Sequence, residues 1–544
     1  MKSVMAHQFS RVPHVSIPRS QFNRSHGNKL TMDAGYLVPI FVDEVLPGDT
    51  FNLQENLFGR LATPLHPFMD NLFLDTFYFF VPNRLIWNNF QKFMGEQENP
   101  GDSTDYLVPT INSGNDGFAN SSIHDYFGLP TDVPNLEVNS LHHRAYNLVW
   151  NEWFRDQNLQ DSVPVNKDDG PDDINDYVLL RRGKRHDYFT SALPFPQKGP
   201  AVQLPIGSKA PVFGEPQGVA SGNLLMQTRA STGGVITTGN LFVTPSTTDV
   251  SFTGSTSPYS RPISLATKEQ YEEASSTYAP PYADLSEATA ATINQLREAI
   301  TIQQLYERDA RGGTRFTEII RSHFGVISPD ARLQRPEYLG GSSTRIHINP
   351  VAQTSESTDD SPQANLAAFG TVSKSNRGFV QSFTEHGVII GLASLRADLN
   401  YQNGLNRMWS RQTRFDFYWS TFANLGEQAI LNKEIFAQGG NAVPDATIDD
   451  QVFGYQERYA EYRYKPSTIT SQFRSNYAQS LDTWHLAQDF SALPALNESF
   501  IEDNPPIDRV IAVPSEPHLI LDTYFRLICA RPMPVYSVPG LFRL

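Results

Sequence analysis

Hydrophobic and polar positions alternate along much of the chain, which is the pattern of strands that bury one face. Near the carboxyl end, one side of such an alternation carries Leu519, Leu521, Thr523, Phe525, Leu527 and Cys529. Residues 414–419 (RFDFYW) alternate in the same way, and a near-continuous apolar run over 72–81 is typical of a strand covered on both faces. These segments predict an all-β protein.

Three segments have the period of a helix instead. Residues 83–94 begin at Asn83, a residue type that caps helices. Residues 141–154 place Tyr146, Val149, Trp150 and Trp153 on one stripe. The longest predicted helix runs from Ser286 to about Arg311 and ends at two glycines. We expect these apolar stripes to pack against the sheets rather than to form cofactor sites.

The amino-terminal segment differs from the rest in charge. The first acid of the chain is Asp33, and the residues before it include five cations: Lys2, Arg11, Arg19, Arg24 and Lys29. Since no period is visible, we predict a basic extended arm over 1–33, lying inside any assembly. Such a segment is either a solvated tail or an arm held against a polyanion, and the residues alone leave both readings open.

The segment 207–283 differs in composition. About half of residues 207–258 are Gly, Ser, Thr or Pro, and few are charged. This composition fits a disordered linker, but we favour a surface insertion of short strands, because the segments on either side need each other to complete one β domain. The expected organisation is therefore an arm (1–33), a first part of the β domain (34–206), the insertion (207–283) and the remainder (284–544).

Composition and charge exclude several classes of protein. The 38 prolines exclude a long helical rod, and 12% aromatic residues argue against disorder. A net charge of −15 argues against a nucleic-acid binder with a wholly basic surface. The lone Cys529 permits no disulfide within the chain and fits a reducing compartment. Without a signal-peptide core or a membrane-length apolar run, we expect a soluble protein made in the cytoplasm, with no membrane insertion.

Motifs for catalysis are missing from the sequence. It has no phosphate-binding GxxxxGK[ST] loop, no GxSxG elbow and no HExxH helix. His142 and His143 are adjacent in a helical pattern, so they point about 100° apart and do not readily share a metal. We predict no cofactor, no metal and no enzymatic activity. The best alternative is a β-rich carbohydrate-binding protein or a two-carboxylate glycoside hydrolase, with Glu152 beside Trp150 and Trp153 as an unspecific candidate.

Two short segments concentrate opposite charges. The acidic segment 168–177 (DDGPDDINDY) lacks the spacing of a calcium loop, and we favour a solvated loop. The basic segment 181–189 (RRGKRHDYF) could pair with it within one chain or between neighbouring chains. Exposed ion pairs contribute only about 0–1 kcal/mol, so such pairing would set register more than affinity.

Longer strings identify a family. The chain resembles the major capsid protein of microviruses, small single-stranded DNA phages, and within them the gokushovirus branch. The resemblance covers nearly the whole chain except 207–283, and the strings that carry it are YLVPIFVDEVLPGDTF (36–51), NEWFRDQNLQ (151–160), RRGKRHDYFTSALPFPQKG (181–199), ERDARGGTRF (307–316), RSHFGVISPDARLQRPEYLGG (321–341), NGLNRMWSRQTRFDFYWSTFANLGEQ (403–428), GYQERYAEYRYKPSTI (454–469) and DTWHLAQDF (482–490).

The resemblance implies an eight-stranded viral jelly roll, two four-stranded antiparallel sheets with long loop insertions and a few short helices. It implies that sixty copies, grouped as pentamers, form a T=1 shell around a circular single-stranded DNA genome. It also implies further partners: a small basic DNA-packaging peptide, an internal scaffolding protein, a minor pilot protein and a host surface receptor, for which a glycan is one candidate. The expected location is the virion, assembled in the cytoplasm of a bacterial host.

Three sets of candidate site residues follow. The arm cations named above are candidates for contacting DNA on the inner face. The insertion is a candidate protrusion at the threefold axes that recognises the host, represented by Leu225, Thr232, Val235, Thr238, Asn240, Phe242 and Thr248. Contacts between subunits are expected at Arg181, Arg182, Arg185, Arg332, Arg335 and Tyr338. The loop 330–341 is either such a contact or an internal turn, and both readings stay open.

Overall fold

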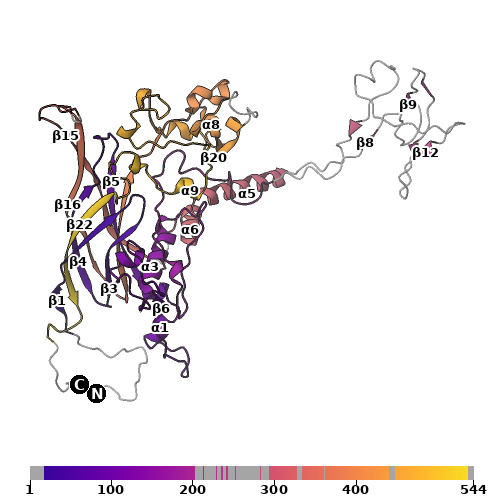
Figure 1. Cartoon of the computed structure of the whole chain (residues 1–544). Coiled ribbons are helices and arrows are strands. Elements are labelled where there is room, and N and C mark those ends of the chain that lie inside the picture. Colours follow the sequence, from indigo (N-terminus) through magenta and orange to yellow (C-terminus); the bar gives the residue numbers. More distant parts are fainter. Residues whose placement is uncertain are drawn as a thin grey trace. The chain divides into compact units, whose positions relative to one another are not determined.

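The computed structural model describes residues 18–202, 293–327, 334–359, 362–439 and 448–536, and the backbone of six short strands between 212 and 283 (Figure 1). The chain divides into two compact units. The first comprises Met1–Lys198 and Glu307–Leu544, and the second comprises Gly199–Tyr306. Each unit is described by itself.

Two antiparallel sheets form the first unit. The first sheet has the order β2–β22–β4–β16–β15, and β1 pairs with the far end of β22. Its strands are β1 (Ser20–Asn23), β2 (His26–Met32), β4 (Thr50–Leu61), β15 (His347–Ala352), β16 (Leu366–Ser382) and β22 (Leu519–Arg531). The second sheet has the order β14–β5–β17–β3. Its strands are β3 (Val38–Val45), β5 (Leu72–Pro82), β14 (Glu337–Arg345) and β17 (Gly387–Ala397).

The order of the strands defines the topology. Taken along the chain, the eight principal strands are β2, β3, β4, β5, β14, β16, β17 and β22. Counted one to eight, they lie in the orders 1-8-3-6 and 2-7-4-5, so consecutive strands fall in opposite sheets except for β5 and β14, which are neighbours in the second sheet. This arrangement is the jelly roll, and it confirms the predicted all-β fold class.

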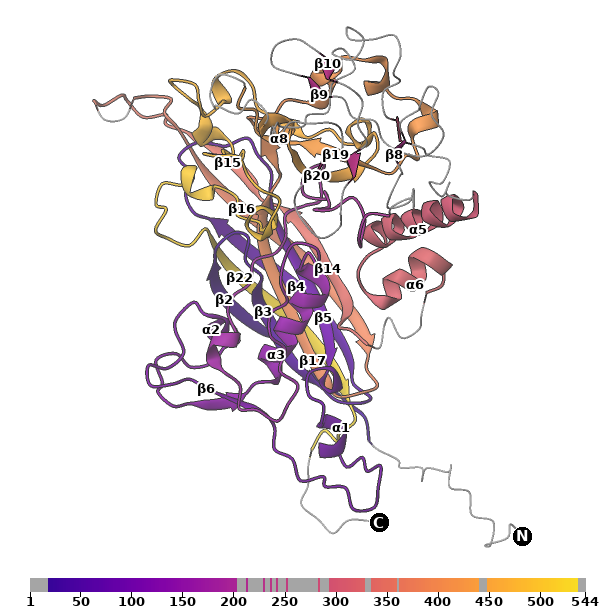
Figure 2. The same ribbon diagram turned by 90° about the vertical axis from the view of Figure 1, so that its right-hand side faces the viewer.

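Burial explains why these residues form strands. Along β22 the residues from Leu519 to Cys529 alternate between buried and exposed, with the predicted face turned into the core between the sheets. Strand β5 is buried on both faces because α3 (Leu141–Val149) packs on the outer side of the second sheet, where Phe79 and Val81 contact Tyr146 and Trp87 in one cluster (Figure 2). Both strand predictions are confirmed.

Two long insertions interrupt the strands. Residues 83–336 connect β5 to β14 and contain α1 (Phe90–Phe93), β6 (Thr110–Asn112), α2 (Ile123–Tyr126), β7 (Glu137–Asn139), α3, a π-helical turn (Trp150–Phe154), α5 (Ile293–Arg311) and α6 (Phe316–Phe324). Residues 398–518 connect β17 to β22 and contain β18 (Asn400–Tyr401), β19 (Glu427–Leu431), α8 (Asn432–Ile435), β20 (Val452–Glu457), β21 (Ser467–Thr468) and α9 (Glu498–Ile501). A separate apolar cluster around Tyr188, Ile430 and Phe500 holds the second insertion together.

The predicted helices are confirmed in part. The prediction over 141–154 corresponds to α3 and its π-helical turn. The described part of the helix predicted over 286–311 is α5, and its predicted start lies outside the described residues. The prediction of one helix over 83–94 was wrong: a 3-10 turn (Asn83–Leu85) and the short α1 flank a break. The break arises because the backbone N–H of Asn88 donates to the carbonyl of Lys167, which removes it from a helical ladder.

The predicted strand over 414–419 was also wrong. Residues 414–416 form a 3-10 turn, and Phe415, Phe417 and Trp419 are each about half exposed. The cause is local, because the carboxylate of Asp416 accepts hydrogen bonds from the backbone of Gln412 and Thr413 and closes a turn.

The amino-terminal segment is more ordered than a free arm. Residues 20–32 are strands β1 and β2, and both pair with β22 in register. Residues 20–32, which lie before the expected boundary at residue 33, therefore belong to the sandwich. The reason is that β22 offers a long ladder of backbone groups that β4 satisfies on one side only.

One ion pair lies inside the core of the sandwich. Glu55 on β4 is fully buried, and Lys374 on β16 donates to it at 2.5 Å while its side chain is 5% exposed. The hydroxyl of Thr76 on β5 donates to the same carboxylate at 3.2 Å. Burial, together with the Glu55 charge, raises the pKa of nearby Tyr78. The ion pair therefore joins two neighbouring strands of the first sheet, and the hydrogen bonds of Thr76 connect it to the second sheet, in a setting where an unpaired charge is costly.

We expect Lys374→Met to lower the free energy of unfolding by about 3–5 kcal/mol, because it leaves Glu55 buried without its cation. Adding Glu55→Leu should restore most of that loss, since the charge is then removed as well. Lys29→Met is the control, because Lys29 pairs with Asp522 at 3.4 Å with both side chains exposed, and its cost should stay below about 1 kcal/mol. Urea unfolding of isolated subunits measures all three, and equal losses for Lys374→Met and Lys29→Met would contradict the expectation.

Candidate assembly surfaces

The basic segment 181–189 binds residues of its own chain. Arg181 donates to the carbonyl of Asp503 at 3.1 Å, and its guanidinium lies 4.1 Å from the ring centre of Tyr36. Arg182 pairs with Asp75 at 2.7 Å, and Arg185 pairs with Asp398 at 2.9 Å. These partners lie on the sheet and on the second insertion rather than in the acidic segment 168–177. Contact between these arginines and neighbouring subunits stays a prediction.

These arginines belong to a larger charged cluster. Arg396 also pairs with Asp75, at 2.9 Å, so two guanidinium groups share one carboxylate. Burial and the charge of Arg182 lower the pKa of Arg396 to about 10. Burial also raises the pKa of the nearby Asp503 to about 6. The cluster fixes the loops around one face of the second sheet.

The acidic segment 168–177 is largely structural. Asp172 and Arg144 form an ion pair at 2.5 Å whose side chains are both fully buried, and Tyr177 donates to the same carboxylate. Burial raises the pKa of Asp172, but the hydrogen bonds from Arg144 and Tyr177 lower it more, so this pKa lies below its usual value. Asp169 accepts from the indole of Trp87 at 2.7 Å. The interpretation as a solvated loop was therefore wrong for Asp172, which is buried and ties the loop to α3. Asp169 is exposed, and its hydrogen bond ties the loop to Trp87.

The histidines are arranged differently from the sequence pattern. His143 is paired with His124 rather than with His142, and the distance between His124 Nδ1 and His143 Nε2 is 2.9 Å. Burial lowers the pKa of His124 to about 4, and burial together with the neighbouring imidazoles lowers that of His143 to about 3. No group of three potential ligands is placed to hold a metal among the described residues. Sequence reasoning missed His124 because nothing in its local pattern marks it.

We expect acid to destabilise the subunit through this pair. Both pKa values lie below the 6.5 of a free imidazole, so the unfolded chain binds more protons than the folded chain between pH 6.5 and about 3. The contribution is fully present above pH 6.5 and falls with pH by up to about 1.4 kcal/mol per unit for each histidine. Urea unfolding between pH 4 and 7 should show a shallower slope for His124→Gln with His143→Gln. His347→Gln, at an exposed position, is the control, and an unchanged slope in the double variant would refute the assignment.

Arg335 and Tyr338 lie beside an edge strand. Tyr338 on β14 is 44% exposed and packs against Phe79 and Trp153 with ring centres 5.5 and 6.0 Å apart. Arg335 stacks on Trp153 at 4.4 Å, and the indole of Trp153 donates to the carbonyl of Pro336. Because β14 ends its sheet, this cluster adjoins a strand edge of the kind that binds other chains. Arg332 lies outside the described residues, and all three contacts stay predictions.

The described arm cations also have partners in their own chain. Arg24 pairs with Asp43 at 3.0 Å, Lys29 pairs with Asp522, and Arg19 donates to Thr50. Lys2 and Arg11 lie outside the described residues. A DNA-binding role of the arm stays a prediction, and it rests chiefly on the residues before Ser20.

The second unit contains the candidate host-recognition residues. Its described strands form antiparallel pairs: β8 (Val212–Phe213) with β13 (Tyr282–Ala283), β9 (Thr228–Arg229) with β10 (Val235–Ile236), and β11 (Leu241–Phe242) with β12 (Ser251–Phe252). Val235 and Phe242 lie on such strands. Five further candidates lie outside the described residues: Leu225, Thr232, Thr238, Asn240 and Thr248. Host recognition stays a prediction.

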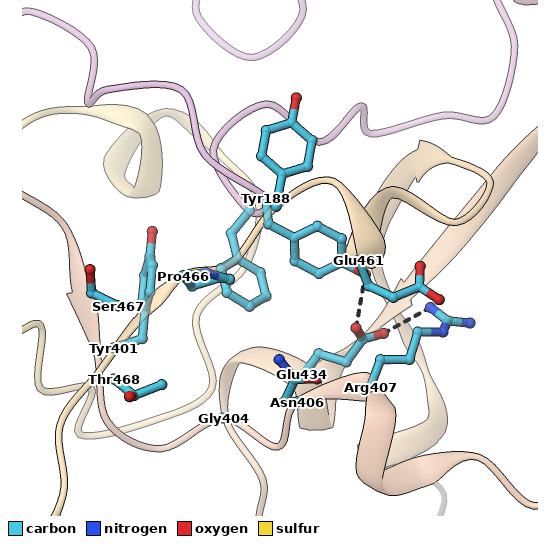
Figure 3. A pocket seen from close by; sticks show the side chains of 12 residues that line it. Tyr188, Tyr401, Gly404, Asn406, Arg407, Glu434, Glu461, Pro466, Ser467 and Thr468 are labelled. Carbon is cyan, nitrogen blue, oxygen red and sulfur yellow. Dashed lines mark hydrogen bonds and ion pairs between the residues drawn. The ribbon is translucent and has the colours of Figure 1, made fainter. Parts of the chain in front are cut away.

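An aromatic pocket lies in the second insertion (Figure 3). Its walls include Tyr188, Tyr401 and Tyr464, and Glu434 lies at its side. Burial raises the pKa of Glu434, as in some catalytic acids. However, Tyr188 donates to one oxygen of Glu434, and Arg407 and the backbone of Leu431 donate to the other. Both oxygens are thus engaged in holding loops together.

The acid nominated for a glycoside hydrolase is engaged as well. Glu152 pairs with Arg315 at 2.7 Å, and the same guanidinium also binds Glu318. At Glu152 and Glu434 the geometry thus offers packed, paired carboxylates rather than an acid and a base across a cleft. None of the described helices is long and apolar enough to cross a membrane.

A jelly roll whose loops exceed its strands in length is the architecture of subunits that build viral shells. The chain belongs to the family described as "Capsid protein (F protein)", whose model matches residues 10–541. It is 52% identical to capsid protein VP1 of Bdellovibrio phage phiMH2K, with 98% of each chain covered. It is also 46% identical to VP1 of Chlamydia phage 1 (100% and 99% covered) and 38% identical to VP1 of Spiroplasma virus 4 (99% and 98% covered).

These matches confirm the resemblance to microvirus capsid proteins of the gokushovirus type. They support a major capsid role and make the chain a virion component. The family and relative names indicate a structural rather than an enzymatic role.

Proposed function

We propose that sixty copies of this chain, grouped as pentamers, assemble into a T=1 icosahedral shell that encloses a circular single-stranded DNA genome. The observation that carries the proposal is the family match over 10–541, which spans the jelly roll and its insertions. A closed point group requires surfaces that bind copies of the same chain around several axes. Many modest contacts then hold each subunit, so the shell is stable although each contact is weak.

Charge supports a division of labour with other virion components. The chain has a net charge of −15, and the genome is itself a polyanion. Packing the two together needs cations from elsewhere, because like charges repel at these densities. The residues before Ser20 supply some on the inner face, and a small basic packaging peptide supplies the rest. An internal scaffolding protein and a minor pilot protein complete the proposed set of partners, and the role is structural without catalysis.

The insertion 207–283 is proposed as the host-attachment element. It is rich in Gly, Ser, Thr and Pro and poor in charge. Loops that interrupt a rigid β scaffold are where binding residues concentrate. The proposed ligand is a host surface receptor, with a glycan as one candidate.

Electron microscopy of the purified protein tests the assembly. We expect closed icosahedral shells of uniform size and elution as a very large particle, because the contacts close on themselves. In reconstructions, residues 225–256 should lie farthest from the particle centre. A monomer or small oligomer under all assembly conditions would contradict the shell, and residues 225–256 on the inner wall would contradict the attachment role alone.

Deleting residues 2–17 tests the DNA contact. This deletion stops before β1, so it spares the strand that pairs with β22. We expect shells to form but the ratio of DNA-filled to empty particles to fall about threefold or more, because phosphate contacts supply much of the affinity for DNA. Full-length Lys2→Gln with Arg11→Gln is the matched control that removes only charge. Unchanged yields of filled particles for both variants would overturn the proposed contact.

A further inference from the structure

The loop between β18 and β19 exposes a dense set of apolar side chains. Residues 403–427 include no buried residue. Eight large apolar side chains in this loop are between 37% and 72% exposed: Leu405, Met408, Trp409, Phe415, Phe417, Tyr418, Trp419 and Leu425. We call these eight residues the aromatic surface. The nearby α8 and β20 lie beyond one end of the two sheets, and α1 lies at the opposite end (Figure 1).

The aromatic surface is as large as the largest apolar patch that a typical monomer exposes. Its five aromatic rings, each at least half exposed, present on the order of 500 Å² of apolar area. A typical monomer exposes about 300–600 Å² in its largest apolar patch, and that patch is often functional. Tyr462, itself 51% exposed, extends the surface through a ring contact with Tyr418. The surface therefore exceeds half of what one partner buries in a standard interface, about 800 Å².

Hydrogen bonds hold the aromatic surface in a fixed shape. The indole of Trp419 donates to the carbonyl of Arg414 at 2.8 Å, and Asp416 closes the turn between them. At the other end, the side chain of Asn406 accepts from the backbone of Met408 at 3.0 Å. Arg407 anchors the loop by donating to the carbonyl of Ala429 at 2.7 Å. Such a surface is organised before it binds, so binding costs less conformational entropy.

The charges around the aromatic surface argue for a protein partner rather than DNA. Single-stranded DNA sites combine stacking rings with an excess of cations along the backbone track. Here Arg407 pairs with Glu434. Arg411 pairs with Glu461 at 3.2 Å while lying over the ring of Tyr462 at 4.3 Å. Carboxylates thus neutralise these cations, and what remains is the aromatic, methionine and arginine composition that is enriched in the cores of protein interfaces.

We infer that the aromatic surface docks onto a second copy of this chain, with the half-exposed or more exposed rings of Trp409 and Trp419 as anchors. The inference rests on the proposed shell, and it names a surface that the shell uses. A copy of the same chain is the favoured occupant because a capsid subunit meets its copies in every particle. The alternation over 414–419 also has the pattern of a buried face that the isolated chain leaves exposed. Buried tryptophans near the middle of an interface carry a large share of binding energy.

Truncation of the surface gives the first test. We expect Trp409→Ala with Phe417→Ala to leave the melting temperature of isolated subunits nearly unchanged, because both side chains are exposed. The subunit concentration needed for shells should rise tenfold or more, because interface anchors are lost. Phe316→Ala is the matched control, because Phe316 is an aromatic residue on α6 that is 75% exposed, and the threshold should not change. A wild-type threshold for the double variant would overturn the inference.

Chemical labelling of a single cysteine gives a second test, in which all the aromatic rings of the surface are kept. The native Cys529 is buried, so Met408→Cys adds one exposed thiol at a position that is 52% exposed. Maleimide should label it readily in isolated subunits and at least tenfold more slowly in empty shells. Equal labelling in subunits and empty shells, or protection in DNA-filled shells alone, would overturn a contact between copies. Failure of the wild-type chain to form any shell would instead contradict the proposed function, which separates the two failures.

Discussion

The position of β22 is the constraint on which the rest of the structure depends. This last strand lies between β2 and β4 and pairs with β4 over twelve residues, from Leu519 opposite Leu61 to Ala530 opposite Thr50. Because side chains alternate, a slip by one residue would turn Phe525 and Leu527 out of the core and expose their whole face. The first sheet is therefore complete only when residues from both ends of the chain meet. The two long insertions leave and return at strands whose register is already set, so they are free to vary while the scaffold stays the same.

Buried charges then determine how the insertions sit on this scaffold. Arg144 with Asp172 fastens the acidic loop to α3, Arg182 with Asp75 fastens the basic segment to β5, and Arg407 with Glu434 fastens the loop that precedes β19. Pairs of this kind add little net stability, because desolvation offsets most of the attraction. Breaking one is costly, however, so each pair excludes alternative placements of its loop. In a subunit that must fit many neighbours, an unvarying loop position matters more than extra stability.

An element of this structure could be predicted from the sequence when the interactions that form it involve residues close to it in the chain. The period of two over 519–529 and the apolar run over 72–81 identified β22 and β5, because burial against the facing sheet repeats with the strand period. The helix prediction over 83–94 failed because the backbone N–H of Asn88 donates to the carbonyl of the distant Lys167, and the sequence near Asn88 does not show this contact. The pairing of His143 with His124 is equally non-local. The strands within residues 20–32 could not be predicted from their own sequence, which shows no period. They form because their backbone pairs with the distant strand β22.

The prediction of a strand over 414–419 failed for a different reason, and that reason bears on function. Alternating aromatic residues are selected where one face is buried, yet Phe415, Phe417 and Trp419 stay exposed within one chain. Leaving them in water costs free energy in proportion to their apolar area, about 25 cal/mol for each Å². The stability of the jelly roll tolerates these exposed rings in the isolated subunit. When a neighbouring copy covers them, the free energy of burying their apolar area favours association. The association free energy of this surface then depends little on salt, because it comes chiefly from apolar area and because Arg407 and Arg411 are already paired within the chain.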